Sequence, residues 1–504
     1  MQDTPHQKKQ LKAIHELMKS KFFTLARTTI DQALLETPGS VPLRLCLLDL
    51  YQQTNDHWEA KRLLDELVIE EPENDRLFMG YPKACLGCGE TEQAIERATE
   101  LSERLGSDNF SAQGVLADMY ETTSRIDELS ELCDRMTPTK PFEHVGLKVC
   151  RSKVLGRRKD YENAAVLCEE AYSDLCALEG SIDQALMNDR KVDLGFQLAK
   201  HYDRLGEYDR AWAAAERAHL DNHEKSRRFS ADDYEKAANE IIQFFSGKVL
   251  RSLAHAQEPQ PHDPLYIIGN PRSGTSLLEQ ILSMHPMVAN GGEMSVTMRM
   301  QEALPKLTDS YNSWPLSLMD MRTADADALG RQYMQTLEYF VNDEKIVSNK
   351  ALNLQMQVGF LSLVTPGARG IMLYRHPLDN CVSCFTTNLL SSGHVYCSDL
   401  DNLGRVWLAR RRLQEHWLEH VEMPLMELHY ESLVQNQEHE TRRLIEFLGL
   451  EWNEECLEFY KSKFVARTIS YDQVNRKMYT TSDGRWKNYE KHLGPLVERL
   501  ADYL

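Results

Sequence analysis

Two patterns of apolar and polar positions divide the chain. Through about the first 220 residues, apolar positions recur at the three- and four-residue spacing of amphipathic helices. After a stretch with three prolines, 254–264, short apolar runs alternate with helical stretches. The runs cover 265–268, 346–347, 371–374 and 425–428. Strands that alternate with helices are typical of a parallel sheet covered by helices, so the sequence predicts a helical region followed by an α/β domain.

The helical region is repetitive. Alanines recur within amphipathic stretches at intervals of 34 residues, and two prolines share that interval. They are Ala26, Ala60 and Ala94, and Pro38 and Pro72. This is the period of tetratricopeptide (TPR) repeats, in which a small residue lets paired helices approach closely and a proline follows the second helix. Glu128 interrupts the series, which returns less regularly at Ala164 and Ala211, so we expect about five or six helical pairs.

The boundary between the two regions follows from capping and proline signals. Ser230 is a favoured helix N-cap residue, and it predicts a helix that runs to about Leu253. We therefore expect a TPR-like solenoid over 1–225, a helix and linker over 226–263, and an α/β domain with a parallel sheet over 264–504. A chain of 504 residues is long enough for two or three cores.

Composition narrows the class of protein. The formal net charge of −19 argues against nucleic acid as a partner, because binding its phosphates needs a basic surface. No run approaches eighteen apolar residues and the polar N-terminus lacks an apolar segment, so the sequence predicts neither a membrane span nor a secretory signal. The cytoplasm is the default location. Eleven cysteines, an odd number, indicate reduced thiols, and the pairs Cys85/Cys88 and Cys381/Cys384 lack a second ligand pair, so no metal site is predicted.

The most informative motif follows the first apolar run. Gly269 opens the segment G-N-P-R-S-G-T-S, whose G-x-x-x-x-G spacing places backbone N–H groups and a helix N-terminus around a cluster of anionic oxygens. Thr275 stands where nucleoside triphosphatases carry the lysine that reaches the β- and γ-phosphates. A 5′-phosphosulfate needs no such lysine, and its sulfuryl group carries less negative charge, so an arginine and backbone amides can replace a metal.

This loop resembles the phosphosulfate loop of sulfotransferases that use 3′-phosphoadenosine 5′-phosphosulfate (PAPS). The resemblance implies that five loop residues hold the phosphosulfate: Arg272, Ser273, Gly274, Thr275 and Ser276. Arg375 closes the third predicted strand and Ser383 follows eight residues later, which is similar to the family's 3′-phosphate site. A guanidinium fork and a hydroxyl suit that phosphate. Thr387 departs from the pattern, because the tyrosylprotein sulfotransferases carry a second arginine there.

Other residues match the family's catalytic positions. The resemblance implies that Glu293, in N-G-G-E-M, is the general base, and a phenol with a pKa of about 10 needs such a positioned acceptor. Lys350, in S-N-K-A, and Ser470, in I-S-Y-D, correspond to residues that stabilise the charge on the leaving phosphate. Tyr430 and Arg485 match nucleotide-binding positions, with Arg485 replacing a family lysine.

The motifs span about 262–500 in the family's order, and the whole chain resembles bacterial TPR-sulfotransferases. The predicted function is transfer of a sulfuryl group from PAPS, without a metal, to a hydroxyl, first of all a tyrosine of a protein or peptide that the repeats recruit. Alternatives stay open: a saccharide or small-molecule acceptor, a P-loop kinase, or a TPR scaffold without catalysis. A homodimer is also compatible with the sequence.

Overall fold

The computed structural model describes residues 5–20, 22–106, 108–222, 229–390, 393–462, 477–478 and 482–504. The chain divides into two compact units, and neither is continuous in sequence. The first contains Met1–Ser124 and Met294–Ala303, and the second contains Arg125–Glu293 and Leu304–Leu504. The predicted domain boundary near residue 225 follows sequence pattern, whereas compactness divides the chain after Ser124.

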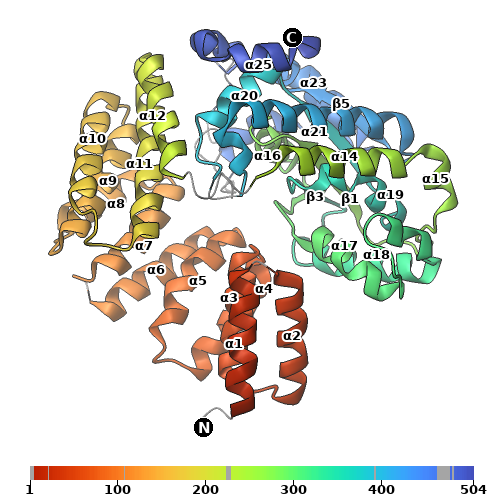
Figure 1. Cartoon of the computed structure of the whole chain (residues 1–504), viewed down its shortest axis with the longest axis horizontal. Coiled ribbons are helices and arrows are strands. Elements are labelled where there is room, and N and C mark those ends of the chain that lie inside the picture. Colours follow the sequence, from red (N-terminus) through yellow and green to blue (C-terminus); the bar gives the residue numbers. More distant parts are fainter. Residues whose placement is uncertain are drawn as a thin grey trace. The chain divides into compact units, whose positions relative to one another are not determined.

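Up to residue 222, the described chain forms twelve helices, and neighbouring helices pack as antiparallel pairs within each unit, such as α3/α4, α5/α6, α9/α10 and α11/α12 (Figure 1). The helices are α1 Pro5–Lys19, α2 Phe23–Glu36, α3 Val41–Gln53, α4 His57–Glu70, α5 Asp75–Gly87, α6 Thr91–Leu105, α7 Phe110–Thr122, α8 Ile126–Arg135, α9 Pro141–Arg157, α10 Tyr161–Ala177, α11 Gln184–Leu205 and α12 Tyr208–Asp221. The repeat alanines Ala26, Ala60, Ala94, Ala164 and Ala211 are completely buried. Close helix packing at these positions confirms the TPR-like arrangement.

The interruption of the repeat at Glu128 has a simple structural basis. Glu128 is exposed on α8, and the neighbouring Leu129 is buried in its place. Helix α8 is therefore kept, packed on α9, although its alanine signal is lost.

The predicted helix from Ser230 to Leu253 is two helices. Ser230 caps α14 (Ala231–Phe244) by accepting a hydrogen bond from the Asp233 backbone N–H at 3.1 Å. The prediction of one continuous helix is wrong, because α14 ends at Phe244 and a second helix, α15 (Gly247–Ser252), follows with Ser246 as its N-cap residue. The break buries the Phe245 ring completely, 5.5 Å from the Trp417 ring.

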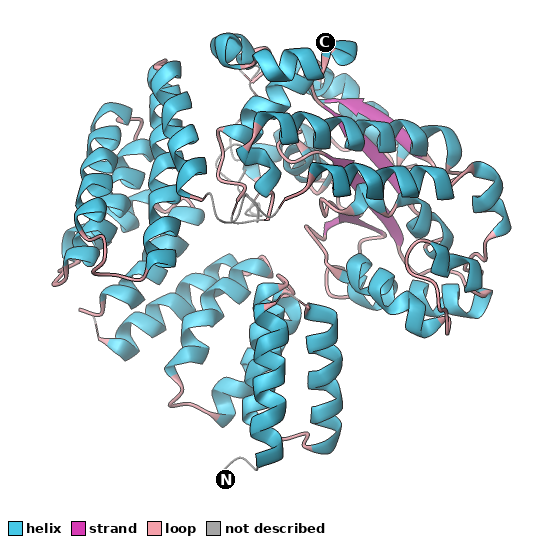
Figure 2. Ribbon diagram, viewed as in Figure 1, coloured by secondary structure: helices cyan, strands magenta, loops and turns pink. Residues whose placement is uncertain are grey.

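The α/β region contains one parallel five-stranded sheet among the described residues (Figure 2). Its strands are β1 Asp263–Gly269, β2 Val288–Asn290, β3 Ile346–Asn349, β4 Arg369–Tyr374 and β5 Leu425–His429. They lie in the order β2-β3-β1-β4-β5, and the four predicted apolar runs are four of them. The register pairs Tyr266 of β1 with Asn349 of β3, and Gly269 of β1 with Leu373 of β4. The carboxyl ends of β1, β3 and β4 therefore meet at one edge, where ligands bind in open parallel sheets.

Helices and 3₁₀ segments surround this sheet. They are α16 Thr275–Leu282, α17 Val296–Leu307, η1 Leu316–Asp320, α18 Thr323–Leu337, η2 Leu354–Met356, α19 Val358–Val364, α20 Pro377–Phe385, η3 Val395–Ser398, α21 Leu400–His420, α22 Tyr430–Gln435, α23 Gln437–Phe447, η4 Glu454–Lys461, η5 Arg485–His492, α25 Gly494–Arg499 and η6 Ala501–Tyr503. Leu265 and Ile267 of β1 belong to a core with α16 and α23. Tyr266, between them, points to the opposite face and packs 5.9 Å from the Tyr333 ring of α18, so both faces are covered.

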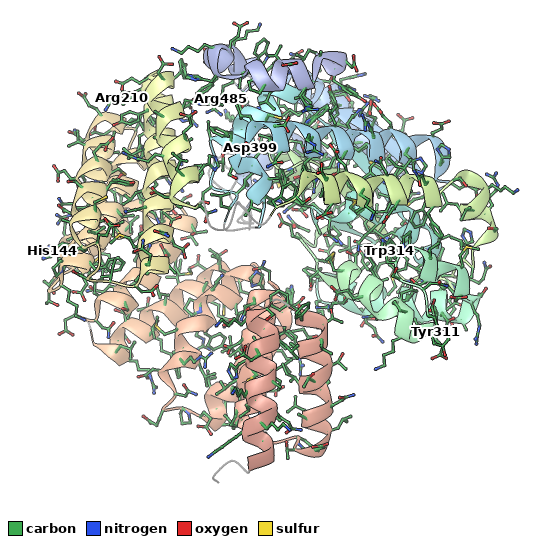
Figure 3. The ribbon with its side chains drawn as sticks, in the orientation of Figure 1. His144, Arg210, Tyr311, Trp314, Asp399 and Arg485 are labelled. Atoms are coloured by element: carbon green, nitrogen blue, oxygen red, sulfur yellow. The ribbon has the colours of Figure 1, made fainter. Side chains whose placement is uncertain are left out.

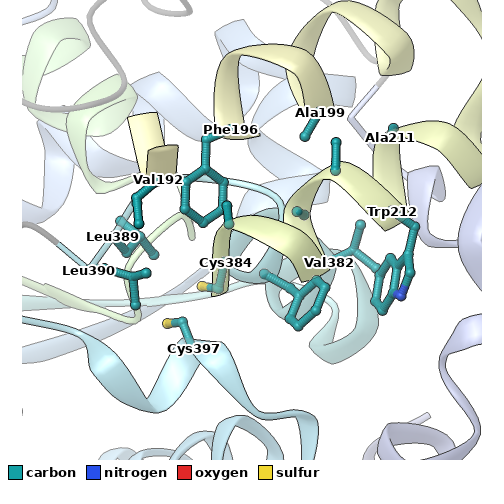
Figure 4. Close-up of a cluster of buried hydrophobic side chains, with 14 of the residues drawn as sticks. Val192, Phe196, Ala199, Ala211, Trp212, Val382, Cys384, Leu389, Leu390 and Cys397 are labelled. Atoms are coloured by element: carbon teal, nitrogen blue, oxygen red, sulfur yellow. The ribbon is translucent and has the colours of Figure 1, made fainter. Parts of the chain in front are cut away.

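A second core joins the last repeats to the α/β region within the second unit (Figure 4). The Trp212 ring of α12 stacks on the Phe385 ring of α20 with the ring centroids 4.3 Å apart. The buried His219 ring donates a hydrogen bond from Nε2 to the Phe385 carbonyl oxygen at 2.9 Å. Repeat helices and the α/β region thus share one continuous apolar interior.

We expect this shared core to weaken in mild acid. Burial lowers the pKa of His219 to about 4, although its hydrogen bond to Phe385 opposes the shift. A histidine whose pKa is lower in the folded than in the unfolded protein stabilises the fold above its unfolded pKa, and this stabilisation is lost as the pH falls from about 6.5 towards 4. The loss should reach about 2 kcal/mol at pH 5.

Urea unfolding at pH 7 and pH 5 measures this loss. His219→Gln keeps a donor for the Phe385 carbonyl but cannot be protonated, so its unfolding free energy should depend less on pH than that of the wild type. His439→Gln, at an exposed position on α23, is the matched control and should behave as the wild type. Equal pH dependence of all three proteins would contradict the prediction.

Candidate active site

The phosphate loop connects the carboxyl end of the central strand β1 to the N-terminus of α16. Arg272 and Gly274 both have positive φ angles, of 64° and 102°. A Cβ atom on Gly274 would lie 2.6 Å from Cδ2 of Tyr430, so glycine is required there for conformation and for space. The Ser273 hydroxyl donates a hydrogen bond to the Asn270 carbonyl at 2.7 Å and braces the loop. Thr275 and Ser276 begin α16 and are nearly buried.

Two side chains of helix α20 bind the backbone of the phosphate loop. The Asn380 side-chain amide donates to the Pro271 carbonyl oxygen at 2.8 Å, and the Cys384 thiol donates to the same oxygen at 3.3 Å. Cys384 therefore has a structural role as a loop contact. This arrangement keeps the loop in a single conformation with its backbone amides pre-positioned.

Arg375 lies at the centre of the predicted 3′-phosphate site. Its Nη1 donates to the Arg272 carbonyl at 2.8 Å and its Nη2 to the Ser482 carbonyl at 2.9 Å. The guanidinium carbon lies 4.8 Å from the centroid of the Tyr430 ring. Its Nε is buried and has no hydrogen-bond partner within the described residues. Arg272 in turn donates from Nε to the Ser383 hydroxyl at 3.1 Å, so four predicted binding residues are in contact.

A second group of charged residues follows strand β3. The Lys350 ammonium lies 3.1 Å from Oε1 of Glu293 and 3.7 Å from Oε2 of Glu279. The Lys350 and Glu279 side chains are 3% and 4% exposed, whereas that of Glu293 is 48% exposed. Glu279 Oε1 also accepts hydrogen bonds from the Gly292 backbone at 3.0 Å and the Ser348 hydroxyl at 2.8 Å. Of the two carboxylates beside the lysine, Glu293 is the one that solvent or a substrate can reach.

Helix α16 connects the two groups. Its first turn carries Thr275 and Ser276, and Glu279 lies one turn further along the same helix. The phosphate loop and the Lys350–Glu293 pair are therefore positioned by one short, buried element.

The other predicted residues have different surroundings. Arg485 (Figure 3) forms an ion pair with Asp203 of α11 at 2.7 Å. Burial alone would lower the pKa of Arg485, but Asp203 and Tyr489 raise it above its ordinary value. Its place near the nucleotide stays a prediction, supported by two hydrogen bonds from the backbones of Gly484 and Trp486 to the Asp379 carboxylate on α20. Ser470 lies outside the described residues.

A histidine can also act as a general base, and three histidines lie in the α/β region close in sequence to the predicted site residues. His285 uses both ring nitrogens, accepting from the Met287 backbone at 3.1 Å and donating to the Glu451 carbonyl at 2.9 Å. The His376 ring stacks on the Trp486 ring. Burial and the charge of Arg410 lower the pKa of His394 to about 4, against an opposing effect of Glu293. The structure thus favours Glu293 over His285.

Several supporting residues were missed from the sequence. Glu279, Ser348, Asp379 and Asn380 anchor the loop, the lysine or the segment with Arg485. Glu279 could have been recognised from the sequence, because it is the only charged residue in the segment T-S-L-L-E-Q-I-L. The others are polar residues at strand and helix ends, where many sequences carry them.

Among the described residues, no group of three or more histidine, cysteine, aspartate or glutamate side chains is arranged to hold a metal ion. None of the described helices combines the length and the apolar character that a membrane crossing needs.

Comparison with known proteins shows what the α/β region is similar to. Residues 264–454 match the family model described as "Sulfotransferase family". An uncharacterized protein of Aquifex aeolicus is 26% identical over 422 residues, which are 82% of this chain and 53% of that protein. The chain therefore spans about half the length of that relative. Protein-tyrosine sulfotransferase A of Caenorhabditis elegans is 24% identical over 52% of this chain and 68% of its own length. Protein-tyrosine sulfotransferase 1 of Danio rerio is 26% identical over 42% of this chain and 61% of its own length.

Solved structures show weaker likeness. The sulfotransferase domain of a Synechococcus olefin synthase matches with a TM-score of 0.33 and 16% identity, over 46% of this chain and 90% of its own. A tetratricopeptide repeat protein of Parabacteroides merdae matches with a TM-score of 0.30 and 14% identity, over 42% of this chain and 90% of its own. TM-scores of this size add nothing to the sequence match.

Proposed function

We propose that this chain transfers a sulfuryl group from PAPS to an acceptor hydroxyl, a proposal supported by the match of residues 264–454 to the sulfotransferase family model. We further propose that the acceptor is a tyrosine of a protein or peptide, since two of its relatives are named protein-tyrosine sulfotransferases. The observation that carries the proposal is that the short helix α16 begins at the arginine-containing phosphate loop and also carries Glu279, whose carboxylate contacts Lys350 beside Glu293.

The donor end of the site fits a nucleotide with a 3′-phosphate. The buried Arg375 Nε is a donor without a partner among the described residues, and Ser383 and Arg272 add polar groups beside it. The Tyr430 ring closes over Gly274, where no larger residue fits. We propose that Arg375 and Ser383 hold the 3′-phosphate, that Tyr430 and Arg485 contact the nucleotide, and that residues 272–276 hold the phosphosulfate.

The acceptor end of the site supplies acid–base chemistry. PAPS, when bound, supplies the sulfuryl group and leaves as adenosine 3′,5′-bisphosphate. Glu293 takes the proton of the acceptor hydroxyl while the new O–S bond forms. Lys350 donates a hydrogen bond to that carboxylate, and its ammonium stabilises the charge left on the departing phosphate oxygen. We also propose that the repeats bind the acceptor protein, because stacked helical pairs offer an extended surface.

A binding comparison tests the donor assignment. Isothermal titration should show adenosine 3′,5′-bisphosphate binding roughly 10- to 100-fold more tightly than ATP with magnesium, because each charge-assisted contact to the 3′-phosphate contributes about 1.5 to 3 kcal/mol. Preference for ATP would favour a kinase instead. With labelled PAPS, a tyrosine peptide should become labelled and its phenylalanine counterpart should not. Labelling of only a saccharide or a small phenol would contradict the tyrosine assignment and leave the donor assignment intact.

A further inference from the structure

The segment Met294–Ala303 belongs to the first compact unit, although the residues before and after it belong to the second. It contains the first part of α17, in which Val296 and Met300 are buried. The chain therefore passes from one unit to the other directly after Glu293. That position is significant because Glu293 is the proposed base.

Asp56, at the start of α4, is the repeat residue that binds this segment. Its Oδ1 lies 2.6 Å from Nη1 of Arg299 and accepts a further hydrogen bond from the Ser295 hydroxyl. Its Oδ2 accepts a hydrogen bond from the Thr54 hydroxyl at 2.7 Å. The Asp56 side chain is only 12% exposed. A charge-assisted network of this burial is stronger than an exposed surface pair.

The backbone on the other side of Glu293 is also fixed. The Gly292 N–H donates to Glu279, and the Gly292 carbonyl accepts from the Lys350 backbone at 2.8 Å. Gly292, before Glu293, is thus held by Glu279 and Lys350, and Ser295, after it, is held by Asp56. The orientation of a carboxylate in such a turn depends on both ends of the turn.

We propose that Asp56 is a positioning residue for the reaction: through Ser295 and Arg299 it fixes the segment that directly follows Glu293, and so orients the base. The inference rests on the proposed function, because it requires Glu293 to act on the acceptor. It predicts an effect on kcat with no effect on donor affinity, since every residue assigned to the donor lies outside this segment.

The test is a kinetic double-mutant cycle in the full chain. Asp56→Asn keeps the shape of the side chain and removes its charge, and kcat should fall roughly 10- to 100-fold, the usual cost of a small displacement of a reacting group. The affinity for adenosine 3′,5′-bisphosphate should not change. In a Glu293→Gln background, Asp56→Asn should cause little further loss, because a residue that acts through Glu293 has nothing left to position. Ser295→Ala, a smaller change, should lower kcat in the same direction.

Asp49→Asn is the matched control. Asp49 forms an ion pair with Arg76 at 2.6 Å in the same unit, and its loss should leave kcat unchanged. Three results would overturn the inference: normal kcat in both Asp56→Asn and Ser295→Ala, an equal loss in the wild-type and Glu293→Gln backgrounds, or an equal loss in Asp49→Asn. Failure of the proposed function looks different, because Glu293→Gln itself would then keep its activity.

Discussion

Replacing Glu293 with glutamine should lower kcat by roughly 10²- to 10⁴-fold and leave the affinity for adenosine 3′,5′-bisphosphate unchanged. Glutamine keeps the size of the side chain and its contact with Lys350 but cannot take a proton from the acceptor. Of the two carboxylates beside Lys350, this is the accessible one, so no other nearby carboxylate replaces it. Steady-state kinetics with a tyrosine peptide, together with donor titration, measures both quantities.

Glu422→Gln is the matched control for this variant. Glu422 is exposed and lies 3.9 Å from Arg251, so its replacement should change neither kcat nor donor affinity. The catalytic assignment would be wrong if Glu293→Gln kept a near-normal kcat and only its melting temperature fell. Such a result would mean that Glu293 serves as a charged partner for Lys350 and nothing more.

Replacing Arg375 with alanine should weaken the binding of adenosine 3′,5′-bisphosphate by about 2 to 3 kcal/mol and barely change that of ATP. The difference arises because only the first ligand has a 3′-phosphate for the Arg375 guanidinium. Titration of both ligands gives the comparison. Arg369→Ala, at the opposite end of β4, is the control and should leave both affinities unchanged.

Arg375 also holds the carbonyls of Arg272 and Ser482, so alanine removes two internal contacts. Arg375→Lys separates the two roles, because it keeps the positive charge and loses the planar fork. It should bind the 3′-phosphate with intermediate affinity in a folded protein. Equal losses for both nucleotides in both variants would disprove the 3′-phosphate assignment.

The helices and strands of this fold could be predicted where the local spacing of apolar residues determines them. The alanine period marks the tightest helix contacts, and all the repeat alanines are buried. The four apolar runs are strands, because a parallel strand buried on both faces requires continuous apolar residues. The three-residue strand β2 was not predicted, because an apolar run of this length cannot be distinguished from a loop.

The candidate site was predictable at residues whose identity is dictated by chemistry. Arg272, Arg375, Ser383 and Tyr430, at four places in the sequence, lie in contact in the structure, whereas their binding roles stay a prediction. Arg485 shows the limit, because its partner Asp203 lies 282 residues away on a repeat helix and no local pattern reveals such a pair. The shared core of α12 and α20 was hidden for the same reason: its residues look like the ordinary interior of two separate domains.

The discontinuous first unit also sets an order of events during synthesis. Its helices α1–α7 emerge from the ribosome first, but the segment Met294–Ala303 that completes the unit is made only about 170 residues later. At elongation rates of roughly 5 to 20 residues per second, this interval is about 10 to 30 s. Throughout that time the Asp56 carboxylate lacks its partner Arg299. The contact that we propose to orient Glu293 is therefore completed late, well after helices α1–α7 have emerged.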